Sequence, residues 1–414
     1  MSEPERIYDA VVVGGGPAGA SVAIHLAKGG ARVLLAEQKK FPRAKLCGEF
    51  ISPECLLHFE RLGVADSMLA AGGTSLNETI FYSRKGAGLN VPSEWFGAGG
   101  AALGLSRAEM DARLLARARE SGVEVLEETQ AAALLFEGER VRGVRLKTGA
   151  GVREARAHVS IDATGRSRSL ARRVEGSNRG ESSERKKRAR LVAFKAHLEG
   201  TSGAAGCCEI YFYPGGYGGL NSVEGGLSNL CFIAAARDVR ACGGNPERVM
   251  REIVATNRRA AATLEGARAQ SEWLAVSLDG FGRRRLAPAS GLLAVGDAAS
   301  FIDPFTGSGM LMALESGELA AQVISRHLSA LRLSATSRSN AAFQTLADGY
   351  RALYGERFNA RLRVCSLLRR AVFVPRLAEA GIRVLSASSR ARRRLARATR
   401  SKGMRSLDER MSDK

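Results

Sequence analysis

The sequence predicts an α/β fold in which a Rossmann-like nucleotide-binding domain carries an inserted, mostly antiparallel β-sheet and a basic helical C-terminus. Three short segments predict this fold: Gly14–Gly19 near the start, Asp162–Gly165 in the middle, and Gly296-Asp297 late in the chain. Each segment directly follows an apolar run typical of a buried strand. Ligands of open α/β sheets bind beyond the carboxyl ends of the strands, so the three segments indicate one shared site.

The first segment has the pattern of a dinucleotide-binding loop. The apolar run from Ile7 to Val13 leads into Gly14-x-Gly16-x-x-Gly19, and residues 17–28 read as a helix. These glycines permit a tight turn, close approach to a pyrophosphate, and packing of the helix on the strand. The helix N-terminus offers free N–H groups to the phosphates. A second strand is expected over 31–36, and Glu37 at its end has the spacing of a carboxylate that binds a ribose.

The other expected elements follow in chain order. Leu105-Ser106-Arg107 opens a helix, and strands are expected over 123–126, 131–136, 141–146 and 158–162. Residues 166–190 read as a polar, basic connection. Strands over 191–198, 209–213, 218–223 and 230–235 follow with little helix between them, which favours an antiparallel sheet. We expect one helix over 246–267, a strand over 291–295, and a long helix over 310–327.

These elements divide the chain into three regions. The nucleotide-binding domain is expected over 1–73, 104–175 and 286–330, and the inserted substrate domain over 74–103 and 176–285. The basic helical C-terminal region covers 331–414.

The composition is that of a globular protein, with 45% hydrophobic and 25% charged residues in 414. The polar N-terminus predicts no signal peptide, and no run of 18 apolar residues predicts a membrane span. Seven cysteines without a CxxC pair fit a reducing compartment, so a cytoplasmic location is expected. Five scattered histidines lack metal-ligand spacing, so no metal is expected.

The net charge of +20 is concentrated near the C-terminus. Residues 351–414 carry 18 Lys+Arg and 5 Asp+Glu, and Arg185–Arg190 forms a second basic cluster. Three explanations are open: ordinary packing of a helical face, an amphipathic helix on an anionic membrane, or nucleic acid. Nucleic acid is not expected, because no aromatic residues are interleaved for stacking. A peripheral position on the inner membrane surface stays open. The tail's apolar residues at helical spacing are Leu362, Leu367, Leu368, Phe373, Leu377, Ile382, Leu385 and Leu395.

Five segments together resemble the single-fingerprint flavoprotein monooxygenase superfamily, which has the p-hydroxybenzoate hydroxylase-type fold and includes geranylgeranyl reductases and flavin-dependent halogenases. They are VVVGGGPAGA (11–20), FPRAKLCGEFISP (41–53), GLSRAEMD (104–111), IDATGRS (161–167) and LLAVGDAASFIDPFTGSGMLMALESGELAA (292–321). The resemblance covers roughly residues 5–330. The second segment resembles the Lys-x-Cys-Gly loop of the geranylgeranyl reductases, with Glu49 where those often have glycine.

The resemblance implies noncovalent FAD in a domain of the glutathione-reductase type. Arg107 would lie near the pyrophosphate or ribityl chain, Asp297 would bind a ribityl hydroxyl, and the loop 304–309 would run beside the isoalloxazine. A helix starting near Met310 would direct its positive end toward that ring. The full set of expected cofactor-binding residues is Gly14, Gly16, Ala18, Gly19, Glu37, Gln38, Lys45, Cys47, Gly48, Arg107, Asp162, Gly165, Gly296, Asp297, Pro304, Gly307, Ser308, Gly309 and Met310.

Candidate catalytic and substrate-contacting residues lie between the three segments. Cys47 could deliver a proton or shape the pocket, although cysteine is also a common small buried residue. Four aromatic residues fall within positions 211–217, and aromatic side chains beside a flavin suit a flat ring or a polyisoprenoid. Tyr211, Tyr213 and Tyr217 are therefore expected to line the pocket. The alternative is that this segment is a core strand with its turn.

The sequence leaves two reactions open for a hydrophobic small-molecule substrate. In the first, NAD(P)H reduces FAD and oxygen is used to hydroxylate an aromatic or polyketide-derived compound. In the alternative, reduced flavin passes hydride to an isoprenoid C=C bond. A non-catalytic flavoprotein on a membrane surface is a weaker third hypothesis. Halogenation is excluded, because Trp95 and Trp273 cannot form that branch's Trp-x-Trp motif. No second dinucleotide motif is visible, so NAD(P)H would dock transiently, or a ferredoxin-type protein would donate electrons.

Overall fold

A seven-stranded sheet forms the frame of the first part of the molecule. The computed structural model describes residues 7–96, 100–177, 190–333, 340–373 and 375–400. The sheet order is β8-β2-β1-β11-β10-β9, and β19 pairs with β11. Its strands are β1 (Tyr8–Val13), β2 (Val33–Ala36), β8 (Glu124–Leu126), β9 (Gln130–Glu137), β10 (Arg140–Thr148), β11 (Gly151–Asp162) and β19 (Leu292–Ala294). Strands β8, β2, β1, β11 and β19 run parallel, so their carboxyl ends meet at one edge.

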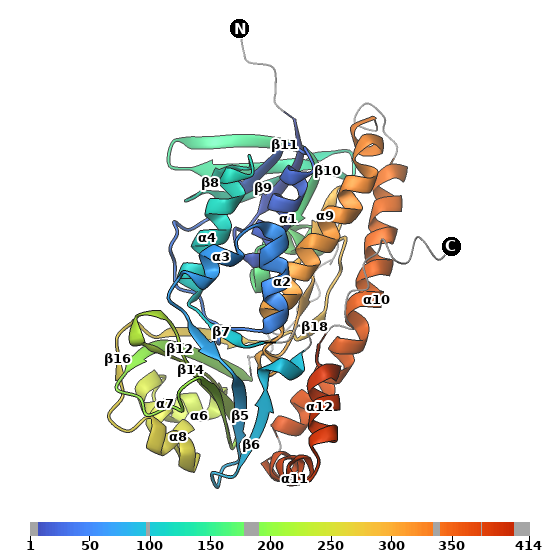
Figure 1. Cartoon of the computed structure of the whole chain (residues 1–414). Helices are drawn as coiled ribbons and strands as arrows, with labels where there is room; N and C mark the ends of the chain where they lie inside the picture. Colours follow the sequence, from blue (N-terminus) through green and yellow to red (C-terminus); the bar gives the residue numbers. More distant parts are fainter. Residues whose placement is uncertain (1–6, 97–99, 178–189, 334–339, 374, 401–414) are drawn as a thin grey trace.

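Helix α1 covers one face of this sheet and confirms the predicted strand–loop–helix unit. It runs from Pro17 to Lys28, with Pro17 at a position where a missing N–H costs no hydrogen bond. It packs against α4 (Arg107–Glu120) and α9 (Gly309–Leu333), as Figure 1 shows. The α1–α9 contact is close, because a Cβ on Gly317 would lie 2.6 Å from the Ala18 carbonyl oxygen.

The second sheet has eight strands in the order β16-β12-β15-β14-β13-β5-β6, with β17 paired to β12. They are β5 (Glu78–Tyr82), β6 (Gly88–Pro92), β12 (Leu191–Glu199), β13 (Cys207–Tyr213), β14 (Gly216–Ser222), β15 (Ser228–Ala235), β16 (Arg268–Ala269) and β17 (Leu274–Leu278). All neighbouring pairs are antiparallel except β13 and β5. The prediction of a mostly antiparallel inserted sheet is confirmed.

Smaller elements connect the two sheets. One short sheet joins β3 (Phe50–Ile51), β7 (Ala102–Gly104) and β4 (Thr74–Leu76), and β18 (Gly282–Arg283) pairs with β20 (Ser300–Phe301). The short α-helices are α2 (Pro53–Leu62), α3 (Ala65–Leu69), α5 (Ala171–Ser177), α6 (Ala236–Ala241), α7 (Pro246–Glu252) and α8 (Arg258–Thr263). The 3₁₀ turns are η1 (Ser93–Phe96), η2 (Gly165–Ser167), η3 (Glu224–Gly226), η4 (Val254–Thr256), η5 (Gly296–Ala298) and η6 (Pro304–Thr306).

The prediction of one helix over 246–267 was wrong, because α7 ends at Glu252 and α8 begins at Arg258. Asn257 accepts hydrogen bonds from the N–H groups of Arg259 and Ala260 and thereby caps α8. Its amide also donates to the carbonyl oxygens of Tyr82, Ser83 and Phe212. Because the Asn257 side chain is fully buried and makes these contacts, it interrupts the helix between α7 and α8.

Over residues 340–373 and 375–400, the basic C-terminal region forms the helices α10 (Ala341–Val372), α11 (Pro375–Ser386) and α12 (Ser389–Ala398). Figure 1 shows α10 beside α9, with α11 and α12 beyond its end and close to β6. Leu368, Ile382, Leu385 and Leu395 face the interior, whereas Leu367 is 65% exposed. Within the described ranges, no helix is both long and apolar enough to cross a membrane. Most of the basic cluster at 185–190 lies outside the described residues.

Candidate active site

One cavity of about 950 Å³ connects the carboxyl ends of the parallel strands with the inner face of the second sheet. It begins at Val13 and Ala36, which end β1 and β2, and at Val295, which follows β19. It continues to Phe212 and Ile233 of the second sheet. Its size is in the range of small-molecule and cofactor sites.

The three glycine-containing segments meet at this cavity, which Gly14, Gly16, Gly165 and Gly296 all line. Gly14 has a φ of +110°, and a Cβ there would lie 2.4 Å from the Ala163 carbonyl oxygen. The first and second segments therefore touch through a residue that must be glycine. Ala18 also lines the cavity, whereas Gly19 lies behind the loop, where its Cβ would be 1.8 Å from the Gly14 carbonyl oxygen.

Glu37 directly follows β2 and hydrogen-bonds to the glycine loop that begins at Gly14. Its carboxylate accepts hydrogen bonds from the backbone N–H groups of Gly15 (2.8 Å) and Lys39 (3.0 Å). Both Glu37 and its neighbour Gln38 line the cavity. The acid is thus at the position that the fingerprint predicts, at the edge of the glycine loop.

Asp162 shapes the second segment from within and does not line the cavity, contrary to its expected contact with a cofactor. One carboxylate oxygen accepts from the Thr164 N–H (3.0 Å) and hydroxyl (2.6 Å). The other accepts from the N–H groups of Leu170 (3.1 Å) and Ala171 (2.8 Å). The side chain is fully buried, so it holds the turn that exposes Gly165.

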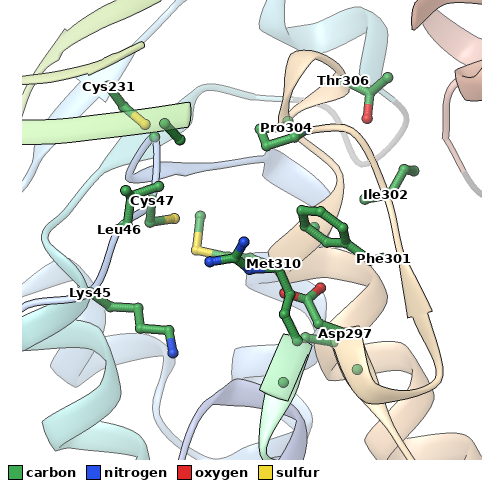
Figure 2. A pocket seen from close by; sticks show the side chains of 18 of the residues that line it. Lys45, Leu46, Cys47, Cys231, Asp297, Phe301, Ile302, Pro304, Thr306 and Met310 are labelled. Carbon is green, nitrogen blue, oxygen red and sulfur yellow. The ribbon is translucent and has the colours of Figure 1, made fainter. Parts of the chain in front are cut away.

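Basic side chains gather at this end of the cavity, and two of them pair with the carboxylate of Asp111. Arg107, at the start of α4, makes a bidentate ion pair with Asp111 (2.7 and 2.8 Å), and Arg43 lies 3.3 Å from the same carboxylate. Burial lowers the pKa of Lys45, and the charges of Arg107 and Arg43 lower it further. Burial raises the pKa of Asp297, against the opposing effect of Arg166 and Lys45. Figure 2 shows Lys45 and Asp297 directed into the same open space.

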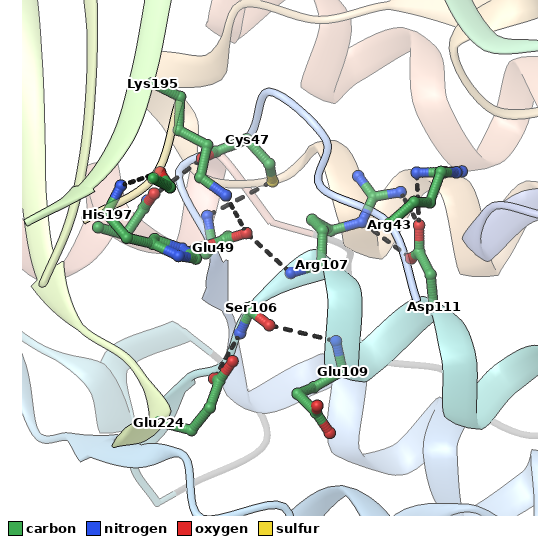
Figure 3. Close-up of polar contacts among 12 residues, drawn as sticks. Arg43, Cys47, Glu49, Ser106, Arg107, Glu109, Asp111, Lys195, His197 and Glu224 are labelled. Carbon is green, nitrogen blue, oxygen red and sulfur yellow. Dashed lines mark hydrogen bonds and ion pairs between the residues drawn. The ribbon is translucent and has the colours of Figure 1, made fainter. Parts of the chain in front are cut away.

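A buried cluster around Glu49 joins the Cys47–Gly48 loop to the second sheet. The Glu49 carboxylate lies 2.5 Å from Lys195 Nζ and 2.6 Å from His197 Nε2, and it accepts the Arg107 N–H at 2.8 Å (Figure 3). These partners hold the pKa of Glu49 below its usual value although burial raises it. Glu49 has a φ of +51°, a conformation that favours glycine. The hydrogen bonds of this cluster therefore hold Glu49 in a backbone conformation that glycine would adopt more easily.

The loops on either side of the cavity bring two sulfur atoms and a helix start together. Cys47 and Gly48 line one side, and Pro304, Gly307, Gly309 and Met310 line the other. Figure 2 shows Cys47 and Met310 directed into the same space. Ser308 does not line the cavity. Its buried hydroxyl lies 3.2 Å from the carbonyl oxygens of Thr306 and Thr399 and donates its one proton between them.

The aromatic segment contributes fewer residues to the cavity than predicted. Tyr217 lines it and donates a hydrogen bond to Asp303 at 2.5 Å. The expectation that Tyr211 and Tyr213 line it was wrong, because successive side chains of a strand point to opposite faces. Ile210 and Phe212 face the cavity, whereas both tyrosines pack in the core on the other face of the sheet.

The sequence did not predict which residues form the walls of the apolar part of the cavity, which we call the substrate lobe. Phe81, Leu89, Val91 and Phe96 line it from β5, β6 and η1. Leu368, Ile382, Leu385, Arg392, Leu395 and Arg400 line it from α10–α12 and the residues that follow. The apolar spacing of the tail was a usable signal, because it marks a helix face that must be covered.

The chain matches the model of a protein family described as FAD binding domain over residues 7–330. It is 28% identical over 324 residues to digeranylgeranylglycerophospholipid reductase 2 of Methanopyrus kandleri, and 76% of each chain is covered. It is 27% identical over 342 residues to the menaquinone reductase of Mycolicibacterium smegmatis, again with 76% of each chain covered.

Solved structures show the same fold. A geranylgeranyl bacteriochlorophyll reductase-like protein from Thermoplasma acidophilum has a TM-score of 0.75 at 19% identity, with 99% of both chains covered. A probable FAD-dependent monooxygenase from Pseudomonas aeruginosa has a TM-score of 0.69 at 20% identity, covering 91% of this chain and 99% of that one. Both the predicted fold and the predicted superfamily are confirmed. The chain belongs to the FAD binding domain family and is an FAD-dependent oxidoreductase.

Proposed function

We propose that this protein reduces C=C bonds of an isoprenoid chain with FAD. The observation that carries the proposal is the continuity of the cavity, which leads from the glycine loops into the apolar substrate lobe under α11 and α12. An apolar lobe excludes water and suits a hydrocarbon chain. The names of the curated relatives support the choice, since they are reductases of a digeranylgeranylglycerophospholipid and of menaquinone.

The residues at the strand ends fit an extended FAD. We infer that the Gly14–Gly16 loop and the start of α1 hold the pyrophosphate, with Arg107 and Lys45 supplying positive charge. Glu37 would contact the adenosine ribose, and Asp297 the ribityl chain. Gly165, Gly296 and the loop from Pro304 to Met310 would then border the ring system.

In this proposal FAD, once bound and reduced, would supply a hydride for one carbon of the double bond. The second carbon takes a proton, so the substrate gains two hydrogens. Cys47 Sγ lies at the cavity and accepts the Glu49 N–H at 3.4 Å, which fixes the thiol at the loop. We propose that the Cys47 thiol donates that proton and is reprotonated from water before the next turnover. The electrons would come from NAD(P)H, which would dock transiently, or from a ferredoxin-type protein.

Hydroxylation of an aromatic or polyketide-derived compound is the second candidate. It is favoured by the ring cluster at the cavity, where Phe305 contacts Phe81 (5.7 Å), Phe212 (5.7 Å) and Tyr217 (5.5 Å between ring centroids). Aromatic side chains bind flat rings well. The same cluster also suits the planar double bonds of an isoprenoid.

The products formed with and without oxygen test the proposal. The purified holoenzyme is incubated with isoprenoid substrates, either with NADPH in air or with NADPH or dithionite without oxygen. The products are identified by mass spectrometry. If the protein reduces C=C bonds, the product should gain two hydrogen atoms both with and without oxygen. A product that gains one oxygen atom and forms only in air would instead establish hydroxylation.

The Cys47→Ser variant tests the proton assignment. We expect it to retain FAD, seen as absorbance near about 450 nm, and to lose about a hundredfold in turnover, as expected for a lost general acid. Cys207→Ser is the matched control, because Cys207 is partly buried and does not line this cavity. Unchanged turnover of Cys47→Ser would remove the thiol from the mechanism.

A further inference from the structure

Arg400 is a buried arginine that lines the cavity two positions after the end of α12. Its side chain is only 4% exposed. Nε and Nη1 are both buried and have no hydrogen-bond partner among the residues that the structure describes. Buried guanidinium groups normally use their five donors, so this arrangement is costly unless a ligand completes it.

The Arg400 guanidinium lies near a carboxylate, an aromatic ring and the Pro304–Met310 loop. Glu54 Oε1 lies 3.8 Å from Nε, which is beyond hydrogen-bond distance, and the Phe96 ring centroid lies 4.1 Å from Cζ. A Cβ on Gly307 would lie 3.8 Å from Nη2, so that nitrogen faces the Pro304–Met310 loop. Burial lowers the pKa of Arg400, although the Glu54 charge opposes the change.

Arg392, which lies in α12, adds a second positive charge. It lines the same cavity, its Nη1 donates to the Asn90 carbonyl oxygen at 3.1 Å, and its Nε is buried without a partner among the described residues. The charged lining residues from the described part of α10–α12 and Thr399-Arg400 are these two arginines. Leu385 and Leu395 lie in the same wall. The substrate lobe therefore combines an apolar surface with cationic donors.

We propose that Arg400, supported by Arg392, binds a terminal oxyanion of the ligand, a phosphate or a carboxylate, while the apolar part of that ligand lies in the substrate lobe. The proposal deepens the proposed function, because it adds an anionic end to the isoprenoid. A guanidinium matches both oxyanions through two parallel N–H donors. Arg400 acts here as a specificity-determining residue for binding.

The test compares three ligands that share one C10 chain: geranyl phosphate, geranic acid and geraniol. Binding to the FAD-loaded protein is measured by calorimetry, without turnover. We expect the wild type to bind both anions about tenfold or more tightly than the alcohol, the gain expected from charge-assisted hydrogen bonds. Inorganic phosphate is also tested as a competitor of geranyl phosphate. We expect it to compete only weakly, because it lacks the apolar chain.

The Arg400→Met variant should bind geranyl phosphate and geranic acid no more tightly than geraniol. The Arg400→Lys variant should retain part of the preference for the two anions. Arg393→Met is the matched control, because Arg393 is exposed in α12, and it should behave as the wild type. If Arg400→Met does not fold, Glu54→Gln/Arg400→Met removes both buried charges together.

A wild type without preference for the anions, or an Arg400→Met protein that keeps the preference, would overturn the proposal. Tight competition by inorganic phosphate alone would also overturn it, since the site would then bind a free anion. The readout is binding, so this result is independent of whether the reaction is reduction or hydroxylation.

Discussion

Glu49 shows at the scale of one residue how the cofactor loop is tied to the substrate sheet. Its carboxylate is fully buried with Lys195 and His197, both on β12. The folded pKa of Glu49 lies below the ordinary value of 4.5. A depressed carboxyl pKa contributes stability above the unfolded pKa, and that stability is lost as the pH falls through the folded pKa.

We therefore expect Glu49→Gln to lower the free energy of unfolding by about 3 kcal/mol at neutral pH, because it leaves buried Lys195 without its counter-charge. The difference from the wild type should narrow as the pH falls below about 4.5. Urea unfolding across pH measures it, with the exposed Glu94→Gln as control. A difference that stays constant with pH would contradict this account of the cluster.

Gly14 is the residue through which the first two glycine segments meet. Because its φ is +110° and a Cβ would lie 2.4 Å from the Ala163 carbonyl oxygen, Gly14→Ala forces the segments apart. We expect a loss of at least about 2 kcal/mol of stability and of most bound FAD. Absorbance of the purified flavin and urea unfolding report both effects. Gly149→Ala, at a position with open space around it, should change neither.

The sequence could predict Gly14, Gly16 and Glu37 because the chemistry of a glycine loop is local. It could not predict which tyrosines face the cavity. Tyr211 and Tyr213 alternate with Ile210 and Phe212, and the face that each pair occupies depends on the partner strands. The partners of Glu49 were equally hidden, since Lys195 and His197 lie nearly 150 positions away along the chain.

At the scale of elements, α11 forms a wall of the substrate lobe. Leu385 lines the cavity, whereas its neighbour Val384 is 68% exposed. We expect Leu385→Trp to fill the lobe and to lower kcat/KM for a C20 isoprenoid at least about tenfold, as an overpacked site would. FAD content should not change. Val384→Trp is the matched control, and equal losses in both variants would show that the lobe does not hold the chain.

Elements were predictable where their signals are local. The helix Pro17–Lys28 was predicted with its observed bounds, because glycine and proline mark its start. The break between α7 and α8 depends on contacts of Asn257 with Tyr82 and Phe212, which lie far away in the sequence. The apolar spacing of the tail was read correctly as helical, but only tertiary structure shows that it faces a cavity.

At the scale of the whole molecule, the net charge of +20 offers a larger basis for membrane contact than the apolar side chains of the tail do. Ile382, Leu385 and Leu395 line the cavity. Among the described side chains of α10–α12, only Leu367 and Val384 are large, apolar and exposed. We therefore propose that any membrane contact is electrostatic. Vesicles rich in phosphatidylserine should bind the protein at about 0.05 M salt and release it at about 0.5 M. Co-sedimentation measures this, with neutral vesicles as control. Binding that survives high salt would instead indicate insertion of apolar residues.

We propose that one cavity brings FAD and an isoprenoid chain together for reduction. Rapid mixing under strictly anaerobic conditions tests it most directly: the dithionite-reduced holoenzyme, freed of excess dithionite, is mixed with an isoprenoid substrate, and absorbance near about 450 nm is followed. We expect the absorbance of oxidised flavin to return without oxygen, in step with formation of the saturated product. Flavin that stays reduced until oxygen is admitted, across neutral and anionic isoprenoids, would contradict it.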